Sequence, residues 1–340
     1  MDVNGKKVSV IGAKRSGLAA AGLLAANGAA VFVSELGTLS AAEGRRLDEL
    51  GVVWEQHRHS GRVFDADLAV VSPGIPPSAA VVRRIRELGI PLFSEIEIAG
   101  RFCRARIAGI TGTDGKTTTS TLLYRIAEAD GAEHGYRAFS AGNIGVPFSS
   151  LVSEMAEGDL AVVELSSYQL EGCDRFRPAV AVLTNITSDH LDRYEGDMRR
   201  YASAKFRIYG AQRKPDTLVY NYDDPLLREH FSCRERLFPF RILPFGIGAG
   251  VRESGASEFF IFDGDLISRC RHGGFEPVVA GAEFLKSSFR GAHNISNALA
   301  AVAAADALGI GRKAIRGALS AFRGVEHRQE YVRKIGRAHV

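Results

Sequence analysis

The sequence has neither a run of like charges nor a long apolar run. Its 43 lysine and arginine and 39 aspartate and glutamate side chains are interspersed along 340 residues, so the net charge is only +4. Arms that bind nucleic acid and patches that bind membranes need clustered basic residues, which this chain lacks. A membrane-spanning helix needs about 18 or more consecutive apolar residues, and no stretch approaches that length. We therefore expect neither nucleic acid nor a membrane among its partners.

Cysteine is also scarce. The four cysteines lie far apart in the sequence, at Cys103, Cys173, Cys233 and Cys270. This spacing excludes the paired cysteines of zinc knuckles and redox motifs, and it favours reduced thiols in a cytoplasmic protein. The amino terminus does not resemble a signal peptide, because the apolar run Val8–Ile11 is short and Lys14 and Arg15 follow it closely.

The sequence does contain short apolar runs that alternate with helix-like segments, which predicts an α/β fold with parallel sheets. For residues 1–99 we expect a Rossmann-like parallel-sheet domain, with strands at 8–11, 30–33 and 68–71 and a helix at 17–27. After a linker near 99–104, we expect residues 100–328 to form a central α/β domain of the P-loop ATPase type. Its predicted strands are 107–110, 160–163, 179–183, 218–220 and 259–262, and its predicted helices are 116–129, 201–209, 293–308 and 313–322.

The strongest chemical motif is a loop between a predicted strand and a predicted helix. It reads Thr111-Gly112-Thr113-Asp114-Gly115-Lys116-Thr117-Thr118. Glycines let the backbone approach a phosphate, and the N–H groups at a helix start attract anions. Lys116 would neutralise the β- and γ-phosphates of a nucleotide, and the Thr117 hydroxyl would bind Mg²⁺. The glycine spacing differs from a standard Walker A motif, so the alternative is an ordinary glycine-rich turn.

Other predicted strands also end in polar residues, and the carboxyl ends of parallel strands share one edge of a sheet. The loop Gly12–Gly17 resembles a dinucleotide fingerprint without its middle glycine, so a phosphate site for another nucleotide is favoured over a nicotinamide site. Ser34-Glu35 ends the second strand, where an acidic residue could meet a ribose or base. Glu164 could be a metal ligand, and His190 a ligand as well. Taken alone, Glu164 is better explained as a solvated strand end and His190 as a capping or hydrogen-bonding residue; their place at the same edge as the phosphate loop is what favours ligation.

Polar residues of the predicted helices have modest interpretations on their own. Lys205 would be a solvated lysine, and Asn294 would cap the helix in which it shares a face with Asn297. His327-Arg328 would be a basic pair on the surface, or a cation that meets a phosphate. These helix and C-terminal residues receive a functional interpretation only when they are considered together with the loops and strand ends described above.

Taken together, the motifs resemble the ATP-dependent Mur ligases of bacterial cell-wall synthesis, over about Lys7 to Glu330. Two pieces favour the members that add D-glutamate, namely Gly142-Asn143-Ile144-Gly145 and Ser166-Ser167-Tyr168-Gln169-Leu170-Glu171. The other matching pieces, in chain order, are Ser72–Ile75, Thr111–Thr118, Glu164-Leu165, Asn185–Arg193, Ala204–Ile208, His293–Ala298 and His327-Arg328.

The resemblance implies a role for each matching position. Contacts along a UDP-muramoyl substrate are implied for Arg15, Ser16, Ser34, Glu35, Gly74, Asn143 and His190. ATP contacts are implied for Gly112, Thr113, Asp114, Gly115, Lys116, Thr117, Thr118, Asn294 and Arg328. The implied Mg²⁺ ligands are Thr117, Glu164, His190 and Lys205, the last as a carbamate. The implied catalytic residues are Lys116, His190 and Lys205.

The reaction that the resemblance implies is ATP-dependent ligation of D-glutamate to UDP-N-acetylmuramoyl-L-alanine through an acyl phosphate, in peptidoglycan synthesis, by a monomer. Another ligase of the superfamily, such as a folylpolyglutamate synthase or a meso-diaminopimelate-adding enzyme, stays open. A nucleotide-binding module without enzymatic activity stays open as well. A nicotinamide-dependent oxidoreductase would leave the Thr111–Thr118 motif unexplained.

The end of the chain departs from the family. Members continue after the histidine–arginine pair with a third domain of ordinary size, roughly 100–150 residues. We expect residues 329–340 to be the start of a truncated C-terminal domain, with residues 334–340 artefactual. The chain as given is therefore expected to bind the UDP-linked substrate and to be inactive in ligation.

Overall fold

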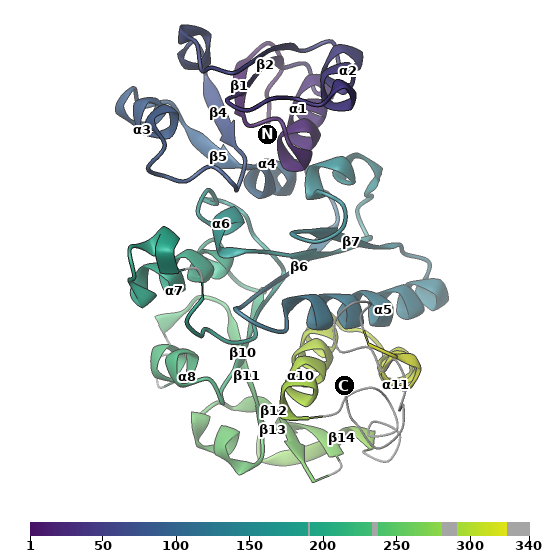
Figure 1. Ribbon diagram of the computed structural model, residues 1–340. Helices are drawn as coiled ribbons and strands as arrows, with labels where there is room; N and C mark the ends of the chain where they lie inside the picture. The colour runs from purple at the N-terminus through teal and green to yellow at the C-terminus, as the bar shows by residue number, and fades with distance from the viewer. Residues whose placement is uncertain (190, 233–236, 265, 281–290, 325–340) are drawn as a thin grey trace, which may run out of the picture. The chain divides into compact units, whose positions relative to one another are not determined.

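The computed structural model describes residues 1–189, 191–232, 237–264, 266–280 and 291–324 (Figure 1). The chain forms two compact units, each made of several segments. Unit 1 comprises residues 1–111, 139–181 and 188–213, and unit 2 comprises residues 112–138, 182–187 and 214–340. The domain boundary expected after residue 99 stays a prediction.

Unit 1 begins with a parallel sheet of five strands in the order β3-β2-β1-β4-β5 (Figure 1). The strands are β1 (Lys7–Ile11), β2 (Ala30–Glu35), β3 (Val53–Gln56), β4 (Leu68–Val71) and β5 (Leu92–Ser94). The helices of this part are α1 (Arg15–Ala26), α2 (Ala41–Glu49), α3 (Ala80–Glu87) and α4 (Glu95–Phe102), with the 3₁₀ turn η1 (Gly61–Phe64). The strand order reverses between β1 and β4, which is where doubly wound folds open a ligand crevice at the carboxyl ends of the strands.

The rest of unit 1 contains a second group of strands. β6 (Arg106–Thr111) pairs in parallel with β8 (Leu160–Glu164), and β7 (Ala138–Gly142) lies beside β8. The helices here are α6 (Ser167–Leu170) and α7 (Met198–Phe206), and the 3₁₀ turns are η2 (Phe148–Ser150), η3 (Val152–Glu154), η4 (Leu191–Tyr194) and η5 (Arg207–Tyr209). Because β6 and β8 are parallel, they end at the same edge of the sheet. The motif Thr111–Thr118 begins at the end of β6, and Glu164-Leu165 lies at the end of β8.

Unit 2 contains β10 (Thr217–Asn221), β11 (Arg241–Ile247) and β12 (Glu258–Asp263) in parallel. An antiparallel extension follows, made of β13 (Leu266–Arg271) and β14 (Gly274–Ala280). The helices are α5 (Lys116–His134), α8 (Pro225–Phe231), α10 (Ala292–Ala307) and α11 (Arg312–Ala321), with the 3₁₀ turn η7 (Ala249–Ser254). The remaining strand, β9 (Val180–Leu183), carries the chain from unit 1 into unit 2.

Helix α10 is buried on more than one face, because it packs against both α5 and the strands β10 and β11. Its sequence is dominated by alanine, and alanine is the best helix former while adding little bulk. Small side chains let α10 approach its neighbours closely, so that its polar first turn is held at a constant place beside the start of α5.

The structure corrects one expected connection. The segment expected to be a linker near 99–104 is helical as far as Phe102, because α4 runs through Glu95–Phe102 with a buried face. Helix α7 ends earlier than expected, at Phe206, and continues as η5. The long helix expected at 116–129 continues to His134, where Gly135 caps it in the left-handed conformation.

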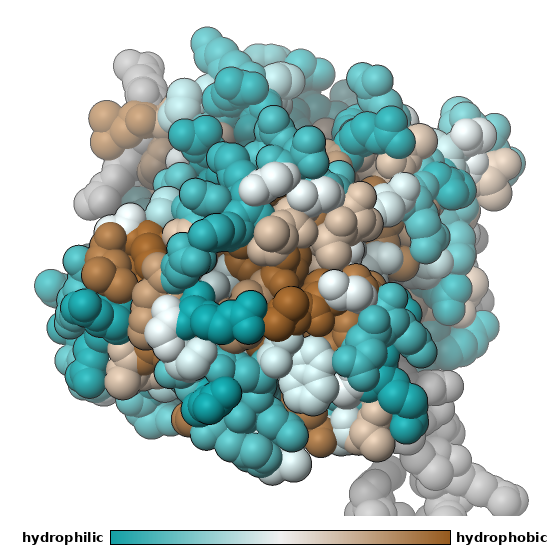
Figure 2. Space-filling view, turned by 90° about the horizontal axis from the view of Figure 1, so that it is seen from above, coloured by the Kyte–Doolittle hydropathy of each residue, from teal (hydrophilic) through white to brown (hydrophobic). Residues whose placement is uncertain are grey.

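Charged and polar side chains cover most of the face shown in Figure 2, and they surround a smaller hydrophobic area near its middle. Exposed large apolar residues of unit 1 include Leu36, Val53, Ile144 and Val146. Single apolar residues at the surface are normal in folded proteins. In the part of the chain that the structure describes, no helix combines the length and the apolar character needed to cross a membrane.

Candidate nucleotide and substrate sites

The Gly112–Thr118 loop joins the end of β6 to the start of α5. The 19-residue helix begins at Lys116, and Gly115 precedes it with a left-handed φ of 78°. The first N–H groups of a helix have no partner within the helix, and the helix dipole adds a partial positive charge there. A methyl group built on Gly115 would lie 1.9 Å from Asn297 Oδ1, so only glycine fits. The arrangement is suited to binding an anion.

A second segment of unit 2 holds this loop in shape. Asn185 accepts a hydrogen bond from the Asp114 N–H at its side-chain oxygen (2.8 Å) and from the Thr113 N–H at its carbonyl (2.9 Å). The Thr187 N–H donates to Thr113 Oγ1 (3.0 Å), and Thr184 Oγ1 donates to the Asp114 carbonyl (2.7 Å). The sequence offered Asn185 and Thr187 only as part of a motif, and their role as supports of the loop was not predicted.

Lys116 and Thr117 begin α5 with different environments. Lys116 Nζ donates to the carbonyls of Gly112 (3.0 Å) and Thr113 (2.7 Å), so the ammonium group lies over the loop. Thr117 is 6% exposed, and its hydroxyl has no hydrogen-bond partner among the described residues. A buried hydroxyl without a partner is costly, so this atom is suited to a ligand.

The Gly112–Thr118 loop opens onto a cavity of about 720 Å³ in unit 2. Asp114, Gly115 and Thr118 line one part of it, and Asn294 and Asn297 of α10 line another. The volume falls within the range of small-molecule sites, roughly 300–1,000 Å³. Sequence reasoning thus named residues from two distant segments that the structure brings to one cavity.

Asp223 also lines the cavity of unit 2, and sequence reasoning missed it. Its Oδ2 accepts a hydrogen bond of 2.7 Å from the Ile247 N–H. Burial raises the pKa of Asp223 above its usual value, while this hydrogen bond acts in the opposite direction. The signal that could have found it was the Asp223-Asp224 pair, which follows the strand predicted at 218–220 after two intervening residues.

In unit 1, the loops after β1 and β4 meet at the switch point of the sheet. Ser72 Oγ donates to the Gly12 carbonyl at 3.1 Å. Glu35 accepts hydrogen bonds from the Ala13 and Gly37 N–H groups, both at 2.8 Å, so the residue at the end of β2 organises the first loop. Arg15 is exposed and half-buried Ser16 follows it.

Ser34 and Gly74 occupy contrasting environments. Gly74 is exposed, whereas Ser34 is fully buried. The Ser34 hydroxyl already has partners inside unit 1, at 2.9 Å from Glu55 Oε1 and 2.7 Å from His59 Nδ1. Burial lowers the pKa of His59, which favours the neutral ring. The position of Ser34 at a strand end was predicted, but the inward direction of its side chain was not.

Asn143, Glu164 and Lys205 all lie in unit 1. Asn143 is exposed, and its Nδ2 donates to Glu164 Oε1 at 3.1 Å, while its N–H donates to the Glu164 carbonyl at 2.8 Å. Lys205 is 1% exposed, and its Nζ lies 4.5 Å from the Tyr201 ring centre. The interpretation of Lys205 as a solvated lysine is therefore wrong. His190 and Arg328 lie outside the described residues.

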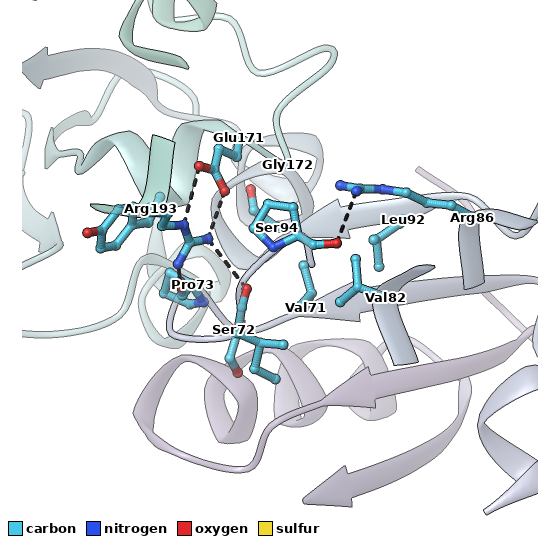
Figure 3. Close-up of a pocket in the computed structure, with 13 residues that line it drawn as sticks. Val71, Ser72, Pro73, Val82, Arg86, Leu92, Ser94, Glu171, Gly172 and Arg193 are labelled. Atoms are coloured by element: carbon cyan, nitrogen blue, oxygen red, sulfur yellow. Dashed lines mark hydrogen bonds and ion pairs between the residues drawn. The ribbon is translucent and has the colours of Figure 1, made fainter. Parts of the chain in front are cut away.

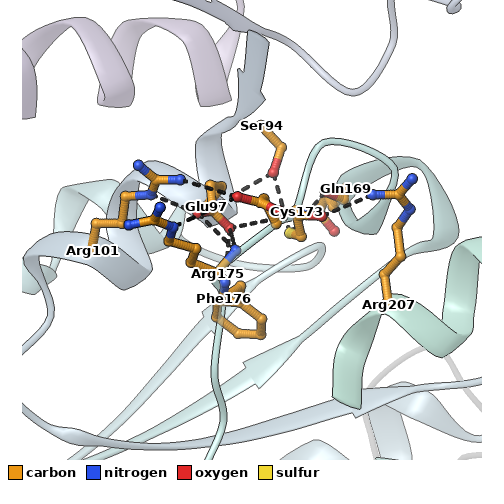
Figure 4. Close-up of polar contacts among 9 residues, drawn as sticks. Ser94, Glu97, Arg101, Gln169, Cys173, Arg175, Phe176 and Arg207 are labelled. Carbon is orange, nitrogen blue, oxygen red and sulfur yellow. Dashed lines mark hydrogen bonds and ion pairs between the residues drawn. The ribbon is translucent and has the colours of Figure 1, made fainter. Parts of the chain in front are cut away.

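A buried carboxylate joins α4 to the segment after α6 (Figure 4). Glu97 is fully buried and accepts hydrogen bonds from the N–H groups of Asp174, Arg175 and Phe176, at 2.8–3.0 Å. Arg101 pairs with it at 2.6 Å. Beside this network, burial raises the pKa of the Cys173 thiol to about 12, so the thiol stays protonated at neutral pH. The network stabilises unit 1.

Two features of this α/β protein are typical of nucleotide-binding proteins. One is the doubly wound sheet of unit 1, and the other is the strand–loop–helix motif at the start of α5. The family model of the Mur ligase middle domain matches residues 110–305, and that of the MurD N-terminal domain matches residues 7–81. The chain belongs to the Mur ligase family.

Relatives and solved structures agree with this assignment. The UDP-N-acetylmuramoylalanine–D-glutamate ligase of Chlorobium limicola is 67% identical over 332 residues, which are 98% of this chain and 71% of the relative. The ligase of the same name from Chlorobaculum tepidum is 52% identical, over 97% of this chain and 70% of the relative. A solved UDP-N-acetylmuramate:L-alanyl-gamma-D-glutamyl-meso-diaminopimelate ligase from Neisseria meningitides has a TM-score of 0.59 at 21% identity, over 95% of this chain and all of that chain. At that identity, it shows the fold alone.

Proposed function

We propose that this chain belongs to an amide ligase that uses ATP to join the carboxylate of UDP-N-acetylmuramoyl-L-alanine to the amine of D-glutamate. The names of relatives that are 50–67% identical support the two substrates. The observation that carries the proposal is the Gly112–Thr118 loop at the start of α5, beside a cavity large enough for a nucleotide. The cytoplasmic location and the monomeric state stay predictions.

ATP would bind in the cavity of unit 2. The Gly112–Thr118 loop and the start of α5 would bind the phosphates, because they provide N–H groups and a positive helix end. Lys116 would leave the carbonyls of Gly112 and Thr113 and neutralise the transferred phosphate. Asn294, which lines the same cavity, would hold the base, and Arg328 would contact the phosphates.

Mg²⁺ is implied by the family, and one described residue is suited to it. Thr117 Oγ1 is a buried oxygen without a partner among them, and Mg²⁺ prefers oxygen ligands. We propose Thr117, Glu164, His190 and Lys205 as the ligand set, with Lys205 as a carbamate whose oxygens carry negative charge. When bound, Mg²⁺ neutralises charge on the phosphates. The burial of Lys205 supports the carbamate, since a buried lysine can react as its neutral amine with CO₂.

The chemistry proceeds in two displacements. An oxygen of the substrate carboxylate attacks the γ-phosphorus, the bond to the β-phosphate oxygen breaks, and ADP leaves with an acyl phosphate formed. The amine then attacks the acyl carbon, loses a proton and expels phosphate. The protein's part is to orient the groups and offset the negative charge, for which Lys116 and the α5 N-terminus are suited.

The UDP-linked substrate would bind at the carboxyl edge of the first sheet in unit 1. Arg15, Ser16 and Gly74 belong to the loops that meet there, and Asn143 is exposed at the end of β7. Glu35 would act by holding the first loop through the Ala13 N–H. Ser34 would contribute through His59 and Glu55, its present partners.

A phosphate-release assay tests the proposal. The full-length protein that includes this chain is incubated with ATP, Mg²⁺ and UDP-N-acetylmuramoyl-L-alanine, and D-glutamate is compared with L-glutamate, meso-diaminopimelate and a folate with glutamate. The Chlorobium limicola relative serves as the positive control, and Lys116→Ala as the negative control. Release that depends on D-glutamate supports the proposal. Release that depends on another amine, or none where the relative is active, contradicts it.

A further inference from the structure

Arg193 contacts segments of unit 1 that lie far apart in the sequence (Figure 3). From η4, its guanidinium donates to the carbonyls of Pro73 (2.8 Å) and Ile75 (3.4 Å). The same group pairs with Glu171, at 2.7 Å from Oε2 and 3.3 Å from Oε1, and lies 4.0 Å from the Tyr168 ring centre. One side chain therefore connects the loop after β4 with the end of α6.

The ion pair is largely removed from solvent. The side chains of Arg193 and Glu171 are 10% and 19% exposed. A buried pair is kept where its geometry and remaining hydrogen bonds are satisfied, and here two carbonyls and one carboxylate satisfy the planar guanidinium. A lysine has a compact charge on a flexible stem, so it would not hold the same three acceptors and the ring together.

Packing around the Ser72–Ile75 loop is incomplete on the side of Arg193, although Ile75 itself packs against the core of unit 1. A cavity of about 70 Å³ lies there, and it is lined by Val71, Val82, Leu92, Ser94 and the loop itself (Figure 3). A methyl group built on Gly74 would meet no atom within 4 Å. The polar bonds of Arg193 to the carbonyls of Pro73 and Ile75 therefore support the loop where the packing leaves a cavity.

On its other side, the same loop contacts the first glycine loop. Ser72 Oγ donates to the Gly12 carbonyl, and a methyl group built on Gly12 would lie 3.1 Å from Ile75 Cδ1. A shift of the Ser72–Ile75 loop toward the cavity would change its spacing from Gly12. Both loops border the switch point of the sheet, where the substrate is proposed to bind.

We infer that Arg193 is a positioning residue, which keeps the Ser72–Ile75 loop at the place that the UDP-linked substrate requires. The inference rests on the proposed function. Arg193 does not need to touch the substrate, because it acts through the carbonyls of Pro73 and Ile75. Its loss should weaken binding of the UDP-linked substrate and leave ATP binding in unit 2 unchanged.

The test measures dissociation constants of the 340-residue chain by calorimetry, for UDP-N-acetylmuramoyl-L-alanine and for ATP with Mg²⁺. Arg193→Lys should weaken binding of the UDP-linked substrate about tenfold, the effect of losing one or two hydrogen bonds from a charged donor. Arg101→Lys is the matched control. Arg101 is also a half-buried arginine of unit 1 that pairs with a carboxylate, Glu97, and lies over a ring, Phe93.

Each outcome has one meaning. If the unchanged chain does not bind the UDP-linked substrate, the proposed function fails. If it binds and Arg193→Lys binds equally well, the inference is overturned. It is also overturned if Arg193→Lys weakens ATP binding equally, or if Arg101→Lys weakens UDP-substrate binding equally. Should Arg193→Lys not fold, Glu171→Gln decides the matter, with an expected loss of about threefold that is specific to the UDP-linked substrate.

Discussion

Gly115 offers a sharp test of the cradle, because a single methyl group there should disturb both stability and nucleotide binding. In Gly115→Ala the new Cβ would lie 1.9 Å from Asn297 Oδ1, 2.8 Å from its Cγ and 3.1 Å from its Nδ2. Rotation of the amide does not relieve this contact, since all three atoms are near. Asn297 belongs to the buried helix α10, so it cannot move away without displacing other groups.

The magnitude has two parts. A residue with a Cβ in the left-handed conformation costs roughly 1–2 kcal/mol. Overpacking of a buried position costs roughly 1–3 kcal/mol more. We therefore expect Gly115→Ala to lower the free energy of unfolding by about 2–5 kcal/mol, and to weaken ATP binding at least about tenfold because the loop and Asn297 are displaced.

Helix α5 provides the matched control at its other end. Gly135 has a φ of 79°, nearly the same as the 78° of Gly115, but a methyl group built on it would meet no atom within 4 Å. Gly135→Ala should therefore show only the first part of the cost and unchanged ATP affinity. Urea unfolding and calorimetry with ATP measure both quantities. Equal effects of the two variants on stability and on ATP affinity would refute the reasoning.

Three further predictions concern buried ionisable groups of unit 1. Glu97→Gln should lower the free energy of unfolding by about 3 kcal/mol, because its charge-assisted bonds are lost, whereas Asp174→Asn at the exposed neighbour should change it by less than about 0.5 kcal/mol in the same urea titration. Burial raises the pKa of Glu95 above its ordinary 4.5, so the unchanged chain should lose stability as the pH rises above about 4.5, because only the unfolded chain ionises freely there. Glu95→Gln should flatten this loss of stability above about pH 4.5, and an unaltered slope would contradict the reasoning. In the full-length protein, Lys205→Ala should lower D-glutamate-dependent phosphate release by about 10–100-fold, with partial recovery in added acetate, and full release without acetate would exclude the carbamate role.

The order of the elements could be predicted because it rests on local patterns. The strand at Leu68–Val71 agrees with its prediction, and α5 starts at Lys116 as expected, since the glycines before it mark the boundary. The linker expected near 99–104 was wrong because two acidic residues interrupt the apolar pattern of α4. One of them, Glu97, is satisfied by N–H groups 77–79 residues further along the chain, which no local pattern reveals.

The partners of single side chains in the candidate sites could not be predicted from local sequence either. The Gly112–Thr118 loop was found by its composition, but the bond from the Asp114 N–H to Asn185 spans 71 residues and depends on the fold. Ser34 and Glu35 were both assigned to a ligand because they end a strand. Successive side chains of a strand point to opposite faces, so at most one of two neighbours faces a given crevice. The fold decides which one, and here Ser34 turns inward to His59 while Glu35 holds the first loop.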